Sequence, residues 1–301
     1  MAVGQGPAGM VGVGNMGGRM CRRMVDAGYQ VRAVDADPGR IPACGAVPAA
    51  SLADLAASCE VIMLSLPDSA VIESVVRGPG GLLASARDGQ IIVDLSTADP
   101  TSTRALHGEL AAKGARYLDA GISGGAAAAE KGTLTLMVGG DGEALAAVRP
   151  MLDTFSAHVH HMGASGTGHV TKVINNFLNG VTLAATAEAM VAGKKAGLDL
   201  AQLLDVINSS SGVSFASLNR FPHIIRGDYL EGGLTGQLMA KDLRLYLSLA
   251  EDLGVSTLIG PGALTAFQVS NALGYADAIS NRVVDAYGDL AGGVRVWKEK
   301  G

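Results

Sequence analysis

The stretch that decides the fold is Met10-Val11-Gly12-Val13-Gly14-Asn15-Met16-Gly17. It follows a strand-like apolar run, opens a helical pattern and has G-x-G-x-x-G spacing. The first glycine permits a tight turn, the second lets backbone approach a pyrophosphate, and the third lets helix and strand pack closely. The N-terminus of the following helix offers N–H donors and the positive end of a dipole to phosphates. The pattern predicts a dinucleotide-binding unit.

An acidic residue follows at the expected distance. Asp35 lies 23 residues after Gly12, at the end of the second strand-like run, close to the spacing of about 20 typical of an acid that binds ribose hydroxyls. A carboxylate there repels a 2′-phosphate and Asp37 adds to that repulsion, whereas Arg40 is the only nearby cation to oppose it. These residues favour NAD as cofactor over NADP.

The first two hundred residues alternate apolar runs with helical patterns. The strand-like runs are 10–13, 30–35, 61–66, 90–95, 116–119 and 134–138, and the helical patterns are 17–27, 51–57, 70–76, 100–113 and 142–155. Strands that alternate with helices indicate βαβ units and a parallel sheet wound right-handed.

The pattern changes after Gly166. Residues 170–197 form one long helical pattern, and 200–209, 237–253, 261–273 and 277–287 also look helical. We therefore expect an α/β fold class: a doubly wound Rossmann sheet in residues 1–165, followed by an all-α domain in residues 166–301, joined by the long helix.

Composition and charge argue against some classes of function. Net charge is −5, with 23 Lys and Arg against 28 Asp and Glu and no basic run, which argues against a nucleic-acid or anionic-membrane partner. Three cysteines without a C-x-x-C motif are typical of reduced thiols in the cytoplasm. Residues 253–276 lack charge, but Gly260-Pro261-Gly262 interrupts them, which indicates a turn and a buried helix rather than a membrane span.

Further motifs follow in order along the chain. They are Gly14-Asn-Met-Gly-Gly-Arg-Met20, Asp94-Leu-Ser-Thr-Ala-Asp-Pro100, Asp119-Ala-Gly-Ile-Ser-Gly-Gly125 with Gly132-Thr-Leu134, Gly166-Thr-Gly-His-Val-Thr-Lys172-Val-Ile-Asn-Asn176, and Lys241-Asp242-Leu243. Together they resemble the β-hydroxyacid dehydrogenase family. The resemblance implies an NAD(P)-dependent oxidoreductase that moves hydride between the nicotinamide and a small 3-hydroxy acid such as 3-hydroxyisobutyrate.

Lys172 and Asn176 are the candidate catalytic residues. They are i and i+4 on one predicted helix, so they share a face about 6 Å apart along the axis. A lysine acts as general acid–base where burial or neighbouring charge lowers its pKa. Asn176 would hydrogen-bond the reacting oxygen or orient the lysine. The structural alternative is a lysine on a solvated helix face.

Ser123, Gly124 and Gly125 form a pattern suited to binding a carboxylate, because a hydroxyl and successive backbone N–H groups can converge on an anion. By the resemblance they bind the substrate carboxylate beside Lys172 and Asn176. It also implies that Thr97, with Leu66 and Pro67, lines the nicotinamide side and that Lys241 reaches over the cofactor from the helical domain. The expected cofactor-binding residues are thus Gly12, Gly14, Asn15, Met16, Gly17, Asp35, Leu66, Pro67, Thr97 and Lys241, and no metal site is expected.

Three features are less typical. Gly121 stands where the family usually has Pro, which predicts a looser loop before Ser123. The histidines of 158–161 indicate a polar turn rather than a metal site, because no Asp, Glu or Cys completes a ligand set nearby. His169 would tune Lys172 or cap the helix start, and we favour the cap.

Alternative functions share parts of this pattern. Enzymes resembling 6-phosphogluconate dehydrogenase share the lysine but add a Glu seven residues later, where Asn179 stands here. Enzymes resembling imine reductases share the fold and generally lack the lysine, and a non-catalytic cofactor-binding module would need neither Lys172 nor Asn176. We expect a site in a cleft between the domains and, from the apolar helical domain, a homodimer or homotetramer.

Overall fold

The computed structural model describes residues 6–297, and its contacts divide the chain into two units. The first unit ends at Lys172 and the second begins at Val173. The boundary expected from sequence was 165/166, seven residues earlier. The structural division falls inside helix α8 (Thr167–Lys195), so the two candidate catalytic residues belong to different units although they share one helix.

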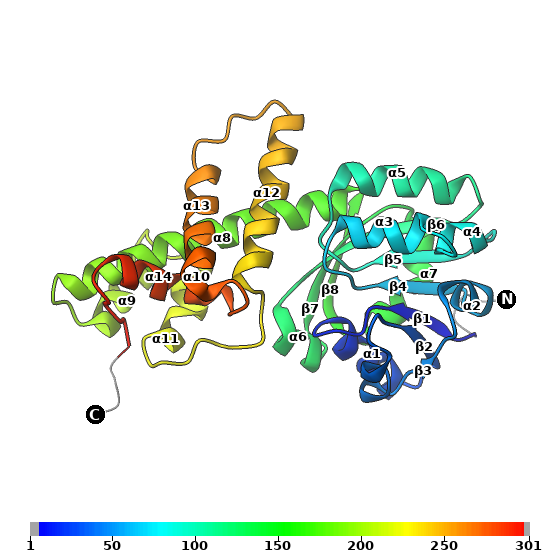
Figure 1. Cartoon of the computed structure of the whole chain (residues 1–301), viewed down its shortest axis with the longest axis horizontal. Helices are drawn as coiled ribbons and strands as arrows, with labels where there is room; N and C mark the ends of the chain where they lie inside the picture. The colour runs from blue at the N-terminus through cyan, green and yellow to red at the C-terminus, as the bar shows by residue number, and fades with distance from the viewer. Residues whose placement is uncertain (1–5, 298–301) are drawn as a thin grey trace. The chain divides into compact units, whose positions relative to one another are not determined.

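The first unit is built on an eight-stranded sheet of order β3-β2-β1-β4-β5-β6-β7-β8 (Figure 1). The strands are β1 (Ala8–Val11), β2 (Val31–Val34), β3 (Val47–Pro48), β4 (Val61–Leu64), β5 (Ile91–Asp94), β6 (Arg116–Ser123), β7 (Leu134–Gly139) and β8 (Ser156–Gly163). Only the β6–β7 pair is antiparallel within this sheet. The order from β3 to β6 is that of a doubly wound dinucleotide fold.

Helices cover both faces of this sheet. They are α1 (Gly17–Asp26), α2 (Leu52–Ser58), α3 (Ser69–Arg77), α4 (Leu82–Ser85), α5 (Pro100–Ala111), α6 (Gly125–Lys131) and α7 (Gly142–Leu152). Because successive strand side chains point to opposite faces, Met63 packs in the core with α1 and α7, and Ile62 packs in the core with α2, α3 and α5. Figure 1 shows α3 and α5 on one side of the sheet and α1 on the other.

Two strands, β3 and β8, lie outside the strand-like runs of the sequence. The histidine-rich segment 158–161, interpreted from sequence as a polar turn, lies inside β8, which pairs in parallel with β7. Most of its side chains are exposed, so the strand lacks the apolar alternation on which sequence prediction depends. Among the described residues no three His, Cys, Asp or Glu side chains are grouped to hold a metal ion.

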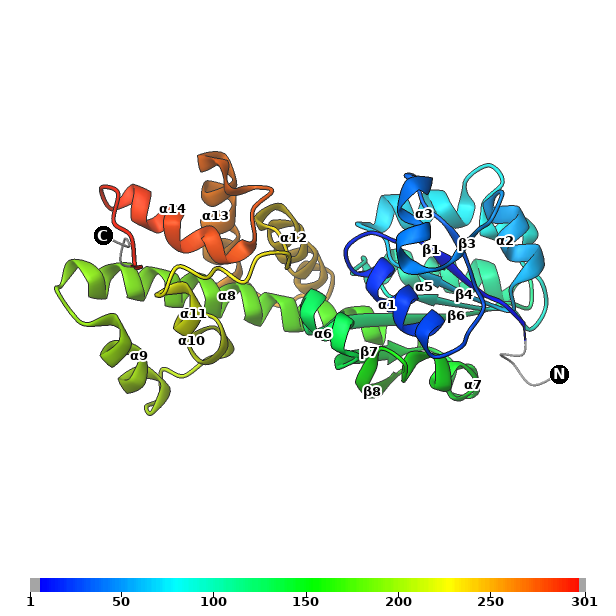
Figure 2. The same cartoon turned by 90° about the horizontal axis from the view of Figure 1, so that it is seen from below.

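The second unit is helical. Besides α8, it contains α9 (Leu200–Asn208), α10 (Phe215–Asn219), α11 (Phe221–Ile224), α12 (Gly236–Asp252), α13 (Gly260–Ser270) and α14 (Val283–Leu290). In Figure 2, α9, α10 and α11 lie on one side of α8, and α13 and α14 lie on the other. Its described residues form no strand beyond one isolated bridge between Thr235 and Ile279. No helix in the described part is long and apolar enough to cross a membrane.

A buried polar cluster braces this helical unit. The Asp285 carboxylate accepts a hydrogen bond from the Tyr229 hydroxyl at 2.7 Å and pairs with Arg282 at 3.0 Å. The Arg282 guanidinium also lies 3.6 Å from the centre of the Tyr229 ring, a cation–π contact. Burial and the Asp285 carboxylate raise the pKa of Tyr229. The cluster joins the segment before α12 to α14.

Candidate active site

The carboxyl ends of neighbouring parallel strands meet at one edge of the sheet, and the candidate cofactor residues follow these ends. In the sheet order β2, β1, β4, β5 and β6 these are Asp35, the loop of 12–17, Leu66 with Pro67, Thr97, and Ser123 with Gly124. In open α/β sheets ligands bind outside these ends, where the strand order reverses. The structure therefore brings the expected residues of the first unit into one row.

The glycine loop has the geometry that a close phosphate approach requires. Gly12 has φ +86°, and a Cβ there would lie 3.1 Å from the carbonyl carbon of Ser65. A Cβ on Gly17 would overlap the carbonyl oxygen of Gly12. Any larger residue would push α1 away from β1 and displace the helix N-terminus that faces the loop.

Asp35 is fixed by two backbone N–H groups. Val13 N donates to one carboxylate oxygen at 2.7 Å, and Asp37 N donates to the other at 2.8 Å. The carboxylate is thus held beside the glycine loop with lone pairs left for a further donor. Asp37 itself pairs with Arg40 at 3.2 Å.

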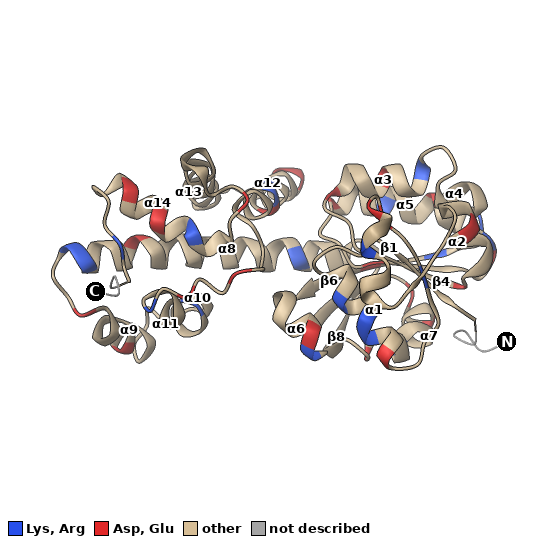
Figure 3. Ribbon diagram, turned by 60° about the horizontal axis from the view of Figure 1, so that its bottom comes forward, with Lys and Arg blue, Asp and Glu red and all other residues tan. Residues whose placement is uncertain are grey.

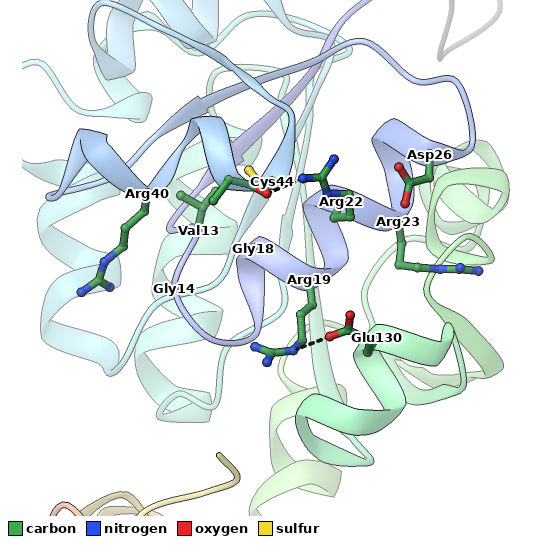
Figure 4. Close-up of a pocket in the computed structure, with 11 residues that line it drawn as sticks. Val13, Gly14, Gly18, Arg19, Arg22, Arg23, Asp26, Arg40, Cys44 and Glu130 are labelled. Carbon is green, nitrogen blue, oxygen red and sulfur yellow. Dashed lines mark hydrogen bonds and ion pairs between the residues drawn. The ribbon is translucent and has the colours of Figure 1, made fainter. Parts of the chain in front are cut away.

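A pocket of about 530 Å³ opens beside this loop (Figure 4). Its charged lining residues are Arg19, Arg22, Arg23, Arg40, Asp26 and Glu130, and Gly14 and Gly18 also line it. The sequence interpretation named Arg40 alone as the nearby cation, and the structure corrects this, because α1 contributes three further arginines. Arg19 bonds the backbone and side-chain oxygens of Asn15 and pairs with Glu130 at 2.9 Å. With four arginines and only two acidic side chains, the lining carries an excess of positive charge, which favours binding of a ligand with phosphate groups.

The ends of β4 and β5 are tied together by side chains of the Asp94 motif. Ser96 Oγ accepts the backbone N–H of Leu66 at 3.0 Å, and Asp94 accepts the N–H of Ser96 at 3.0 Å. The Tyr117 hydroxyl donates to the second oxygen of Asp94 at 2.7 Å. Burial, then the charge of Asp94, hold the pKa of Tyr117 well above its usual range. This network fixes the backbone of Leu66 and of Ser96, the residue before Thr97.

Strand β6 ends at the candidate carboxylate anchor. Gly124 has φ +125° and is the residue before α6, so the chain turns sharply after Ser123. Ser123 is half-buried, and Gly124 and Gly125 are exposed. Gly121 does not loosen a loop, as expected from sequence, because it lies within β6 and pairs with Met137 of β7. That expectation is wrong because β6 extends four residues beyond the strand-like run read from the sequence.

The first turn of α8 is held by the buried Asp119 of β6. The backbone N–H groups of Gly166 and His169 donate to its two oxygens at 2.7 and 2.9 Å. The favoured interpretation of His169 as the cap is therefore wrong: its side chain is buried, with Nδ1 2.7 Å from Thr103 Oγ1. A carboxylate at a helix N-terminus also interacts favourably with the dipole.

Lys172 and Asn176 are buried, with only 8% and 3% of their surface exposed. The alternative of a lysine on a solvated helix face is therefore wrong. In the second unit, Asn176 Nδ2 donates to the Asp242 carboxylate at 2.5 Å, and Lys241 Nζ lies 3.1 Å from the other oxygen of Asp242. Asp242 is itself buried. Asp242 was visible only as part of a sequence motif. Its role could not be predicted, because its partner Asn176 is 66 residues away in the sequence.

A doubly wound sheet with a glycine-rich loop at its strand reversal, followed by a helix with a buried lysine and asparagine, defines a nicotinamide-dependent dehydrogenase. Comparison with known proteins agrees. The model described as the NAD binding domain of 6-phosphogluconate dehydrogenase matches residues 7–163. The model described as NAD-binding of NADP-dependent 3-hydroxyisobutyrate dehydrogenase matches residues 166–287.

The chain belongs to the β-hydroxyacid dehydrogenase family and is an NAD(P)-dependent 3-hydroxyacid dehydrogenase. It is 33% identical to 2-(hydroxymethyl)glutarate dehydrogenase of Eubacterium barkeri over 94% of this chain and 95% of that one. It is 37% identical to the NAD-dependent L-serine dehydrogenase of Pseudomonas aeruginosa over 89% and 93%. Among solved structures it resembles 3-hydroxyisobutyrate dehydrogenase of Mycobacterium tuberculosis with L-serine, at TM-score 0.83, 30% identity and coverage of 93% and 98%.

Proposed function

We propose that this enzyme oxidises a small 3-hydroxy acid resembling 3-hydroxyisobutyrate, with NAD as acceptor and Lys172 as the general base. The observation that carries the proposal is the burial of Lys172 on a helix whose first turn is capped by Asp119 of β6. That strand ends at the Ser123 anchor. One strand thus supports both the acid–base group and the group that would bind the carboxylate. The names of the relatives, which act on L-serine and other hydroxy acids, support the same substrate class.

The chemistry follows from these positions. Ser123 and the N–H groups of Gly124 and Gly125 would bind the substrate carboxylate. Neutral Lys172 accepts the proton of the C3 hydroxyl as the carbonyl forms, and Asn176 hydrogen-bonds the same oxygen. NAD, when bound, supplies the nicotinamide that accepts the hydride leaving C3. In the reverse direction protonated Lys172 returns the proton to the alkoxide oxygen.

The test measures turnover of a panel of substrates through the absorbance of the reduced nicotinamide. 3-Hydroxyisobutyrate, glycerate, 3-hydroxypropionate and L-serine should support turnover, and lactate, which lacks a 3-hydroxyl, should not. Turnover confined to 6-phosphogluconate or to an imine would replace the proposal with one of the alternative enzymes. NAD binding without turnover of any panel member would favour a non-catalytic module.

We propose NAD rather than NADP on the position of Asp35. Its carboxylate, fixed by Val13 and Asp37, would accept the ribose hydroxyls and repel a 2′-phosphate. The arginines of the pocket would then serve the pyrophosphate, and Arg40 is engaged by Asp37. Calorimetric titration should give tighter binding of NAD than of NADP. A strict preference for NADP, lost in Arg40→Ala, would assign Arg40 to the 2′-phosphate and overturn the argument from Asp35.

We also propose a homodimer or homotetramer assembled through the helical unit. The segment between α12 and α13 exposes four large apolar side chains, Leu253, Val255, Leu258 and Ile259, at 52–88% of their surface. Helix α13 carries no charged residue (Figure 3). Exposed apolar surface of this kind is typical of subunit contacts. Light scattering should report a mass at least twice that of one chain, and a monomer would contradict the proposal.

We place the enzyme in the cytoplasm. Cys21, Cys44 and Cys59 are buried and unpaired, which supports a reducing compartment. Burial raises the pKa of Cys21 and Cys59, so these thiols resist oxidation. Fractionation of source cells should find the activity with cytoplasmic markers, and recovery in a secreted fraction would contradict the assignment.

A further inference from the structure

Arg19 is joined directly to the loop that would hold the phosphates of the cofactor. Its Nη1 donates to the backbone carbonyl of Asn15 at 2.6 Å and to the side-chain oxygen of Asn15 at 2.5 Å. Asn15 lies inside the glycine loop, between Gly14 and Gly17, where the pyrophosphate of a dinucleotide approaches the backbone. A guanidinium presents planar N–H donors that suit phosphate oxygens. Arg19 is therefore well placed to bind the pyrophosphate.

Arg19 differs from the other two arginines of α1 in what it contacts. Arg22 and Arg23 donate to backbone carbonyl oxygens, at 2.5 and 3.0 Å. Arg19 instead pairs with Glu130 of α6, which lines the same pocket and has a carboxylate oxygen 2.9 Å from Arg19 Nε (Figure 4). A phosphate that approaches Arg19 therefore meets an anion of the protein that is already bound there.

The pair of Arg19 and Glu130 is held in place by its helices but is open to solvent. Ala129, the residue before Glu130, is buried in the same core as Met20 of α1. The side chains of Arg19 and Glu130 are 37% and 69% exposed. An exposed ion pair changes an equilibrium by at most about fivefold, because water competes for both charges. The pyrophosphate carries more negative charge than one carboxylate, so it can displace Glu130 from Arg19.

We propose that Glu130 is a resident competitor for the phosphates of the cofactor. Its carboxylate occupies Arg19 between turnovers, the pyrophosphate takes its place when the cofactor binds, and the carboxylate returns as the cofactor leaves. The inference rests on the proposed function, which places the pyrophosphate of NAD on the glycine loop and the arginines. Glu130 thereby shortens the lifetime of the bound cofactor, and product release limits turnover in many enzymes.

The test is the rate at which NADH leaves the enzyme, followed by NADH fluorescence after rapid mixing with excess NAD. Glu130→Gln keeps the size of the side chain and removes its charge. A directly paired charge acts on dissociation, whereas a more distant charge at the rim acts on association. NADH should therefore leave Glu130→Gln about three- to fivefold more slowly than it leaves wild type. Release at the wild-type rate would overturn the inference.

Asp26→Asn is the matched control. Asp26 lines the same pocket and is exposed, and the substitution removes the same charge. It should speed the binding of NADH through the field of the pocket, but it should change the release rate by less than about 1.5-fold. Equally slow release from Asp26→Asn would show that loss of any negative charge in the pocket has this effect, and it would overturn the specific role of Glu130.

A second background separates competition at Arg19 from the general field. Arg19→Gln should itself weaken NADH binding about tenfold, because a charge-assisted hydrogen bond to the pyrophosphate is lost. In that background Glu130→Gln should change the release rate by less than about 1.5-fold, since Glu130 has no arginine left to occupy. Unchanged NADH affinity in Arg19→Gln, or the same slowing of release in both backgrounds, would contradict the proposal.

Failure of the proposed function would look different. Wild type that binds neither NADH nor NADPH would refute the cofactor site itself. Wild type that binds NADH but releases it as fast as Glu130→Gln does would refute the competitor alone. If wild type prefers NADPH, the same variants are tested with NADPH, because both cofactors carry the pyrophosphate. All three substituted side chains are at least partly exposed, so the substitutions should leave the fold intact.

Discussion

The sheet unit and the helical unit hold their candidate residues in different ways. In the sheet unit they follow strand ends, and backbone groups make many of the contacts, as with Gly12, Asp35 and Gly124. In the helical unit they are side chains from two helices, with Asn176 of α8 bonded to Asp242 of α12. A backbone site is specified by local glycine spacing, whereas a side-chain pair depends on how distant helices pack.

Lys172 belongs to the sheet unit, and we expect its substitution to have the largest effect on activity. Lys172→Ala should lower turnover about 10²–10⁴-fold, the usual contribution of a general acid–base group, with NAD affinity unchanged. Steady-state rates and calorimetric titration measure the two effects. Lys195→Ala, at an exposed position of the same helix, is the control and should keep turnover. Full NAD-linked turnover in Lys172→Ala would remove Lys172 from the chemistry.

In the helical unit the largest effect should be on stability. Asp285→Ala removes the carboxylate that binds Tyr229 and Arg282 and should cost about 3 kcal/mol in unfolding free energy, because it leaves buried partners unsatisfied. Denaturant titration measures this. Asp277→Ala, at an exposed residue bonded to Gln237, should cost at most about 0.5 kcal/mol. Similar costs for both would mean that the Asp285 cluster does not brace the unit.

A smaller effect tests the side-chain pair directly. Asp242→Leu removes the acceptor of the Asn176 amide and should lower kcat about tenfold, equivalent to one lost hydrogen bond of about 1.4 kcal/mol. Asp242→Asn keeps an oxygen in that place and should recover most of the rate. Equal losses in both variants would show that charge next to Lys241, rather than orientation of Asn176, is what matters.

The smallest effect is a pH dependence of stability. Tyr117 keeps its proton in the folded protein above the usual phenol pKa of about 10. The unfolded chain loses that proton first, so this contribution is complete below about pH 10 and falls as pH rises further, by about 1.4 kcal/mol per pH unit. Denaturant titrations at about pH 9 and pH 11 should show a shallower decline for Tyr117→Phe. Equal declines would contradict the raised pKa of Tyr117.

The same contrast explains what the sequence could predict. The six strand-like runs all correspond to strands, although β1 begins two residues earlier than expected. Strands such as β1, β4 and β5 are buried along their whole length in a sheet covered on both faces, so each leaves a continuous apolar run in the sequence. Helix α6 was missed, since seven residues that include four alanines carry no periodic pattern. The final helix begins at Val283 rather than 277, because a turn at Ser280–Arg282 precedes it.

The candidate site likewise contains some residues whose roles the sequence predicts and others whose partners only the structure reveals. Asp119 was visible in a motif, but its role as the cap of α8 depends on two N–H groups about fifty residues away. The hydrogen bond between His169 and Thr103 also joins residues that only the fold brings together. Glycine spacing therefore predicted where backbone approaches a ligand, whereas the partners of buried side chains required the structure.

The most direct test of the account is a crystal structure of the enzyme with NAD and 3-hydroxyisobutyrate. It should place the adenosine ribose on Asp35 and the nicotinamide beside Leu66 and Thr97. The substrate carboxylate should contact Ser123 and Gly124, and the substrate's 3-hydroxyl should lie within hydrogen-bond distance of Lys172 Nζ. A carboxylate bound away from the end of β6, or a hydroxyl out of reach of Lys172, would contradict the account.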